Sequence, residues 1–200
     1  MFTSRLLINS VICIGLVGCS SLVPQKTDVS QESAPSLSIQ EWHMEGRIGV
    51  QAREDAWHAH IIWNHEPQQD RVQIVGPLNQ RMVSIVIREG LIYINEGKGR
   101  EMLSREPEKA LRERLGFWVP LHSMKYWMTG LPDPAREHTR VTRVDGNTDF
   151  QQLGWRVESS EYRSENGYQC PGKIRIQGQG LKLKLVIDQW QPKRTIGVNP

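Results

Sequence analysis

The chain has 200 residues and a formal net charge of +3, and 38% of its residues are hydrophobic. This length accommodates one domain with a sizeable core, whereas so small a positive excess, without a run of Lys and Arg, does not favour nucleic-acid binding. Seven tryptophans against three phenylalanines give the chain an unusual aromatic content.

The N-terminal segment carries the parts of a secretory signal peptide. Arg5 precedes an apolar run that ends at Leu16-Val17-Gly18-Cys19, and this run is too short to cross a bilayer as a helix. A cysteine directly after Leu-Val-Gly resembles the lipobox of bacterial lipoproteins, in which the thiol receives a diacylglyceryl group and the preceding peptide bond is cut. The alternative is an ordinary signal peptide with a chance cysteine. We expect residues 1–18 to be removed and Cys19 to become the acylated N-terminus.

Residues 19–40 follow as a polar, aperiodic stretch of Ser, Gln, Pro, Asp and Glu. Such a stretch buries too little apolar surface to offset its chain entropy, so it predicts a flexible tether after the acylated cysteine. With Cys13 in the signal peptide and Cys19 acylated, Cys170 has no partner for an internal disulfide.

Alternating apolar and polar residues predict antiparallel strands in two blocks of the chain. Short connections with turn residues, such as Gly76-Pro77-Leu78-Asn79, indicate hairpins within the first block. In the first block, the apolar positions of these alternations are Ile48, Val50, Trp57, Ala59, Ile61, Trp63, Val83, Ile85 and Ile87, followed by the short apolar run from Leu91 to Ile94. In the second block, which ends at Trp190, they are Leu153, Trp155, Val157, Ile174, Ile176, Leu181, Leu183, Leu185 and Ile187.

A helical period separates the two blocks. Glu106-Pro107-Glu108 provides a start signal, Leu111 and Leu115 lie four residues apart, and Gly116 provides a stop. A second helix follows Pro120 and ends at Gly130-Leu131-Pro132.

The second helix places Leu121, Met124, Trp127 and Met128 on one face. A face of Met and aromatic residues at helical spacing is usually core. It is also typical of adaptable binding surfaces, because the unbranched methionine chain repacks around varied guests. Pattern alone favours core.

The order of strands, two helices and strands predicts an α+β fold. A sheet with one wet face and two apolar helices is most simply arranged as a curled sheet with the helices inside the curl. We assign this domain to residues 41–191 and a C-terminal tail to residues 192–200.

No catalytic constellation stands out in the sequence. His58 and His60 share a strand face and can hold a metal, but no further ligand is indicated by spacing, so a solvated face is the default and we assign no metal, cofactor or catalytic residue. Leu78 is an apolar residue at a hairpin tip, where polar residues are expected. It either folds back onto the rim of the barrel or forms an exposed apolar finger that gains about 1.5–3 kcal/mol on entering lipid.

These features together resemble the LolB family, the outer-membrane lipoprotein receptors of Gram-negative bacteria. The resemblance rests on the lipobox at Cys19, the hairpin from Gly46 to Trp63, Pro77-Leu78, Trp127-Met128-Thr129-Gly130-Leu131-Pro132 and the closing strand from Leu181 to Trp190. It implies an unclosed antiparallel β-barrel whose apolar interior is covered by helices, as in LolA and LolB.

The resemblance also implies a function. The protein would be a monomer anchored in the outer membrane and facing the periplasm, accepting triacylated lipoproteins from the periplasmic carrier LolA and inserting them into the lipid. Leu78 matches the family's membrane-insertion leucine, although the family usually reads Asn-Pro-Leu-Gly where this chain has Gly76 and Asn79. Ser20 after Cys19 fits export to the outer membrane under the family's sorting rule.

A triacylated lipoprotein hides dozens of methylenes from water at roughly 0.8 kcal/mol each, so a receptor must offer an apolar cavity. This logic favours a binding protein over an enzyme. The alternatives are a scaffolding envelope lipoprotein with a solid core and a metal hydrolase built on His58 and His60. The residues expected to line the acyl-chain cavity are Ile48, Val50, Trp63, Ile74, Val83, Ile85, Trp118, Leu121, Met124, Trp127 and Met128.

Overall fold

The computed structural model describes residues 39–52, 55–77, 82–139 and 141–193. The predictions for the signal peptide, Cys19, Leu78, most of the tether and residues 194–200 lie outside these ranges. No helix in the described ranges is long and apolar enough to cross a membrane.

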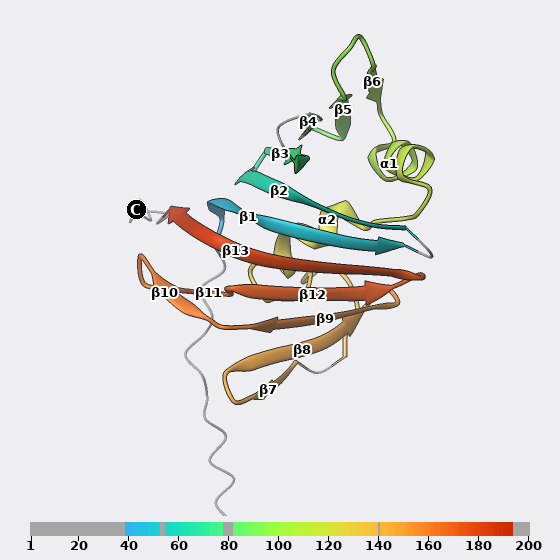
Figure 1. Ribbon diagram of the computed structural model, residues 1–200. Coiled ribbons are helices and arrows are strands. Elements are labelled where there is room, and N and C mark those ends of the chain that lie inside the picture. The colour runs from blue at the N-terminus through green and yellow to red at the C-terminus, as the bar shows by residue number, and fades with distance from the viewer. Residues whose placement is uncertain (1–38, 53–54, 78–81, 140, 194–200) are drawn as a thin grey trace, which may run out of the picture. The chain divides into compact units, whose positions relative to one another are not determined.

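An antiparallel sheet of eleven strands organises the described chain (Figure 1). Its order is β6-β5-β4-β3-β2-β1-β13-β12-β9-β8-β7, so the two edge strands are β6 and β7 and they do not pair with each other. The strands are β1 (Glu41–Ala52), β2 (Asp55–Glu66), β3 (Gln69–Val75), β4 (Met82–Arg88), β5 (Leu91–Asn95), β6 (Glu101–Ser104), β7 (Thr142–Val144), β8 (Asn147–Gln152), β9 (Trp155–Ser160), β12 (Lys173–Gly178) and β13 (Leu181–Lys193). A separate hairpin consists of β10 (Arg163–Glu165) and β11 (Tyr168–Cys170).

Strands β1 and β13 join the two blocks of the sequence at the middle of the sheet. Their pairing shifts register between Glu45 and Gly46, where β13 carries one extra residue, Asp188. A Cβ at Gly46 would lie 2.4 Å from the backbone oxygen of Val186, which no real contact tolerates. Glycine therefore permits the close approach of the two strands at this bulge.

Helices α1 (Pro107–Leu115) and α2 (Leu121–Trp127) lie between the two blocks, as the change of period predicted. Gly116 ends α1 in the left-handed conformation with φ of 77°, and its N–H bonds the carbonyl of Arg112. After α2 the backbone turns away at Gly130, also at φ 77°. Both helices contribute to the same core as the sheet, through Ala110 and Leu111 of α1 and Met124 and Trp127 of α2.

The sheet curls around α2 (Figure 1). The burial patterns of the strands show that their side chains alternate between a concave inner face and an outer face. On β1, Trp42, Met44, Gly46, Ile48 and Val50 are buried, whereas the residues that alternate with them are partly or fully exposed. The expected α+β architecture, an unclosed antiparallel barrel with helices covering an apolar interior, is confirmed.

Some details differ from the sequence prediction. Leu153 is not a strand residue: it sits in the β8–β9 turn at φ 53° and is 37% exposed, since β9 begins only at Trp155. Strand β8 was not predicted, because its inward residues are Thr148, Phe150 and Gln152, and two polar side chains on the buried face conceal the alternation. The short strands β6, β7, β10 and β11 were also not predicted.

Candidate functional site

All of the residues predicted to line a cavity point to the concave face. Seven of them are buried in the core and four are partly buried against it. The buried residues are Ile48, Val50, Trp63, Ile85, Met124, Trp127 and Met128; the partly buried ones are Ile74, Val83, Trp118 and Leu121.

The C-terminal half of the concave face, formed by β13, β12, β9 and β8, is sealed. Its inward side chains are almost inaccessible to solvent, and Trp127 of α2 packs against them. Trp155 lies with its ring centroid 6.4 Å from that of Trp127 and 6.3 Å from that of Trp118. The buried residues of this half include Phe150, Trp155, Val157, Ile174, Ile176, Leu181, Leu183 and Leu185.

A buried hydrogen-bond network fixes α2 and the segment after it against this half. Gln152 accepts hydrogen bonds from Trp127 Nε1 at 2.7 Å and from the backbone N–H of Asp133 at 2.9 Å. Its amide nitrogen donates to the carbonyls of Asp133 and Arg136. The carboxylate of Asp133, fully buried, accepts from Ser123 of α2 at 2.8 Å. Because each of these groups is paired, the network holds a single arrangement.

The N-terminal half of the concave face, formed by β2 to β6, is less completely covered. Its partly exposed inward residues are here named the open strip: Trp57, Ile74, Val83, Ile87 and Met102. Ile74 pairs with Val83 across β3 and β4, and Trp57 pairs with the buried Val50, which puts its indole on the inner face. Trp57 is nevertheless 42% exposed. These five apolar side chains on the inner face are therefore partly accessible to solvent.

Sequence reasoning did not include Trp57, Ile87 and Met102 among the cavity residues. Trp57 and Ile87 belong to the predicted alternating strands, so the alternation itself indicates that both side chains lie on the inner face. Met102 lies on the four-residue strand β6, which is too short to show a period.

A second tryptophan cluster closes the concave face where β1 begins and β13 ends. The ring centroid of Trp42 lies 5.4 Å from those of both Trp63 and Trp190. Asp70 accepts a hydrogen bond from Trp63 Nε1 at 2.9 Å, and its carboxylate lies 2.8 Å from His65 Nδ1. These pairings provide hydrogen-bond partners for polar groups that would otherwise be unsatisfied beside the aromatic rings.

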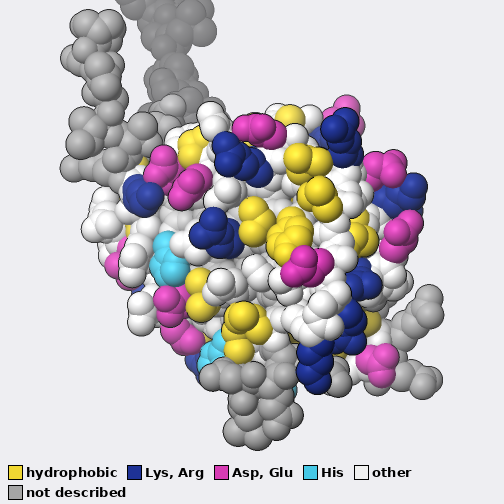
Figure 2. Space-filling model, turned by 90° about the horizontal axis from the view of Figure 1, so that it is seen from above, with side chains coloured by type: hydrophobic (Ala, Val, Ile, Leu, Met, Phe, Trp, Pro, Cys, Tyr) yellow, Lys and Arg dark blue, Asp and Glu magenta, His cyan; other side chains and the backbone are white. Residues whose placement is uncertain are grey.

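The outer face is mainly polar, and its apolar side chains include a row at the β4–β6 edge. Val86 pairs with Tyr93, which pairs with Leu103, and Leu103 is 68% exposed. Figure 2 shows hydrophobic side chains gathered on the molecule as seen from above, with both basic and acidic side chains around them.

His58 and His60 are both exposed on the outer face of β2. Within the described ranges, no group of three His, Cys, Asp or Glu residues is arranged to hold a metal ion. Cys170 is buried, and burial raises the pKa of its thiol to about 12. A thiol in such a site is protonated at neutral pH and is a poor nucleophile.

The comparison with known proteins agrees with this geometry. A family model described as outer membrane lipoprotein LolB matches residues 40–190. The chain belongs to the LolB family. Among its relatives, the outer-membrane lipoprotein LolB of Pseudomonas syringae is 29% identical over 97% of this chain and 98% of its own length. The LolB of Pseudomonas aeruginosa PAO1 is 28% identical over 90% of this chain and 92% of its own.

Membership of the LolB family makes this protein a non-enzymatic outer-membrane lipoprotein that takes part in protein transport. Among solved structures, a LolA superfamily protein from Nitrosomonas europaea is similar with a TM-score of 0.49 and 8% identity, over 78% of this chain and 87% of that one. The lipoprotein LppX of Mycobacterium tuberculosis is similar with a TM-score of 0.36 and 9% identity, over 77% of this chain and 88% of its own.

Proposed function

We propose that this LolB protein accepts acylated lipoproteins from a LolA-like periplasmic carrier, holds their acyl chains on its concave face and releases them into the outer membrane. The observation that carries this proposal is the open strip, an accessible apolar surface beside a sealed core. Each methylene removed from water contributes about 0.8 kcal/mol. Binding of an acyl chain against Trp57, Ile74 and Val83 is therefore favourable.

The transfer needs a direction, and the sequence contains no nucleotide-binding motif that would supply one. Cargo then moves down a gradient of affinity, from carrier to receptor and from receptor to lipid. In this scheme Cys19 anchors the protein, the tether provides reach, and Leu78 brings the domain into contact with the bilayer. The protein acts as a monomer.

The first test measures acceptance of cargo in solution. We define the non-acylated form as the mature chain with Cys19→Ala, secreted behind an ordinary cleavable signal peptide. When it is mixed with a carrier loaded with acylated lipoprotein, cargo should appear on this protein. A carrier that keeps all its cargo would refute the transfer function. If the protein also failed to bind a fluorescent fatty acid, the result would favour a scaffolding lipoprotein.

The second test separates acceptance from release. Leu78→Glu should leave the free energy of unfolding nearly unchanged if the side chain projects from the loop, whereas a residue packed on the rim would destabilise by several kcal/mol when replaced by a charge. The variant should accept cargo from the carrier normally and stall at release into liposomes, because glutamate loses the apolar contact and repels anionic head groups. Normal release by a stably folded variant would remove Leu78 from the mechanism.

A further inference from the structure

A groove on the outer face of the sheet lies beside the base of the hairpin loop that carries Leu78. It has a volume of about 340 Å³, and Pro77 lines one part of it. The side chains that surround it include Arg47, His58, His60 and Lys184, and none of its lining residues is acidic. It faces away from the concave face, so it is not part of the candidate acyl-chain site.

The register of three strands creates this groove. Gly49 of β1 pairs with His58 on one side and with Lys184 of β13 on the other. Neighbouring strands lie about 4.8 Å apart, so His58 and Lys184 start about 10 Å from each other with no side chain between them. A Cβ at Gly49 would meet only the carbonyl oxygen of Lys184, at 3.9 Å. The hollow over Gly49 therefore exists because that residue is glycine.

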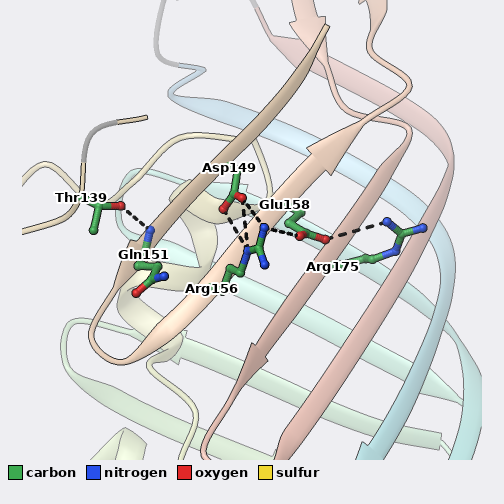
Figure 3. Close-up of polar contacts among 6 residues, drawn as sticks. All are labelled: Thr139, Asp149, Gln151, Arg156, Glu158 and Arg175. Atoms are coloured by element: carbon green, nitrogen blue, oxygen red, sulfur yellow. Dashed lines mark hydrogen bonds and ion pairs between the residues drawn. The ribbon is translucent and has the colours of Figure 1, made fainter. Parts of the chain in front are cut away.

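The basic side chains around the groove differ in whether they form an ion pair with a carboxylate. Arg47 is paired with Asp188 at 2.9 Å. Further along the same face, Arg156 contacts both Asp149 and Glu158, and Arg175 lies 3.8 Å from Glu158 (Figure 3). Among the described residues, by contrast, Lys184 has no acidic partner, although it pairs in register with Arg175.

We propose that this groove binds the phosphate of an anionic phospholipid head group and so orients the domain on the membrane. Charge complementarity favours an anion, because Lys184 has no carboxylate partner among the described residues and none of the residues that line the hollow is acidic, while Arg47 adds a guanidinium that Asp188 already contacts. The volume corresponds to roughly ten water molecules at about 30 Å³ each, enough for a phosphodiester. Its position beside Pro77 places the bound head group next to the loop that is to enter the lipid. The inference deepens the proposed function by naming the lipid that the release step recognises.

The experiment uses the non-acylated form without cargo, so that it does not depend on lipoprotein transfer. Binding is measured by co-sedimentation with phosphatidylcholine vesicles with or without phosphatidylglycerol. Lys184→Gln should weaken binding to the anionic vesicles about fivefold, the effect of one cation near an anionic surface. Lys173→Gln is the matched control: it lies on the same face but is paired with Glu161, and it should change binding less than about twofold.

Gly49→Val tests the groove separately from its charge. The position has ordinary backbone and open space in front of it, and valine is well suited to a strand, so the fold should persist. By filling the hollow without altering any charge, it should weaken binding to anionic vesicles by at least about fivefold. Thermal unfolding of each variant confirms that it is folded.

Several results would overturn the proposal. Normal binding by Gly49→Val with reduced binding by Lys184→Gln would mean diffuse attraction rather than a site, as would equal losses for Lys184→Gln and Lys173→Gln. Inorganic phosphate at constant ionic strength should compete with the vesicles for the groove. Phosphate binding that both variants weaken, with vesicle binding unchanged in both, would identify free phosphate as the occupant. If Lys184→Gln and Gly49→Val impaired cargo transfer from the carrier in solution but left vesicle binding intact, the groove would be a docking surface for the carrier. If neither the wild type nor any variant accepted cargo from the carrier, but the vesicle results were as expected, the proposed function would be refuted while the groove would remain a phospholipid site.

Discussion

The two halves of the concave face contain the same types of apolar residue but differ in how far these residues are exposed to solvent. In the C-terminal half, Trp155 is 1% exposed, packed on Trp127 and held under α2 by the Gln152 network. In the N-terminal half, Trp57 also points inward yet is 42% exposed. The two halves therefore differ in how completely their inward side chains are covered: Trp127 and the Gln152 network close the C-terminal half, whereas the residues of the open strip stay partly accessible to solvent. A stable folded base and an accessible apolar surface can then coexist in one sheet.

The largest effect that this comparison predicts concerns stability. Trp155→Ala should lower the free energy of unfolding by about 3–5 kcal/mol, because it removes a large side chain from a site that cannot collapse around the cavity. Urea denaturation followed by circular dichroism measures the change. Trp57→Ala is the matched control, and its loss should be about 1 kcal/mol or less. Equal losses for the two variants would show that the halves are equally sealed.

A somewhat smaller effect is expected from the polar network of the sealed half. Gln152→Ala leaves the indole N–H of Trp127 and the backbone N–H of Asp133 without their acceptor, and each unsatisfied buried group costs about 1–3 kcal/mol. We expect a loss of about 2–4 kcal/mol in the same denaturation experiment.

Its neighbour Gln151 provides the control. This side chain is exposed on the outer face, and the hydrogen bond to Thr139 comes from its backbone N–H, so Gln151→Ala should stay within about 0.5 kcal/mol of the wild type. If Gln152→Ala were equally mild, the network would not be what fixes α2.

In the open half the effect should appear in binding rather than in stability. Trp57→Ala should reduce the affinity for a fluorescent fatty acid about tenfold, because an indole that covers the guest is worth about 1.4 kcal/mol or more. Fluorescence titration of the non-acylated form measures it. Leu103→Ala, an exposed apolar truncation on the outer face, should leave the affinity unchanged. A comparable loss in both variants would place the probe outside the concave face.

The smallest expected signal comes from the native thiol. Because burial raises the pKa of Cys170 from 9.0 to about 12, the thiol is protonated at pH 8 and shielded in the folded protein. A maleimide reagent should therefore label wild-type protein only through opening of the structure, and faster in Trp155→Ala. The Trp57→Ala variant, which loses about 1 kcal/mol of stability or less, should label within about fivefold of the wild-type rate. Rapid labelling of the wild type would contradict the sealed packing around Cys170 and the neighbouring Pro171–Trp190 hydrogen bond.

The sequence by itself determined the features that depend on local periodicity. The alternation around Ile48 and Val50, the proline and glycine signals bounding α1, and the helical face of Met124 and Trp127 each reflect the geometry of a short stretch, so strands, helices and buried faces were predictable. The lipobox is likewise a local motif that is read directly from the residues before Cys19.

Only the tertiary structure decided which inward residues are sealed and which stay open. Trp57 and Trp155 are equivalent in their alternating patterns, yet Trp155 packs against Trp127 of α2 and is 1% exposed, whereas Trp57 is 42% exposed. In the same way, Gln152 looks like a surface residue until its partners from the segment after α2 are brought to it. The outer groove also joins His58 to Lys184 from opposite ends of the domain, since burial and charge clustering depend on strand pairing between residues far apart in the chain.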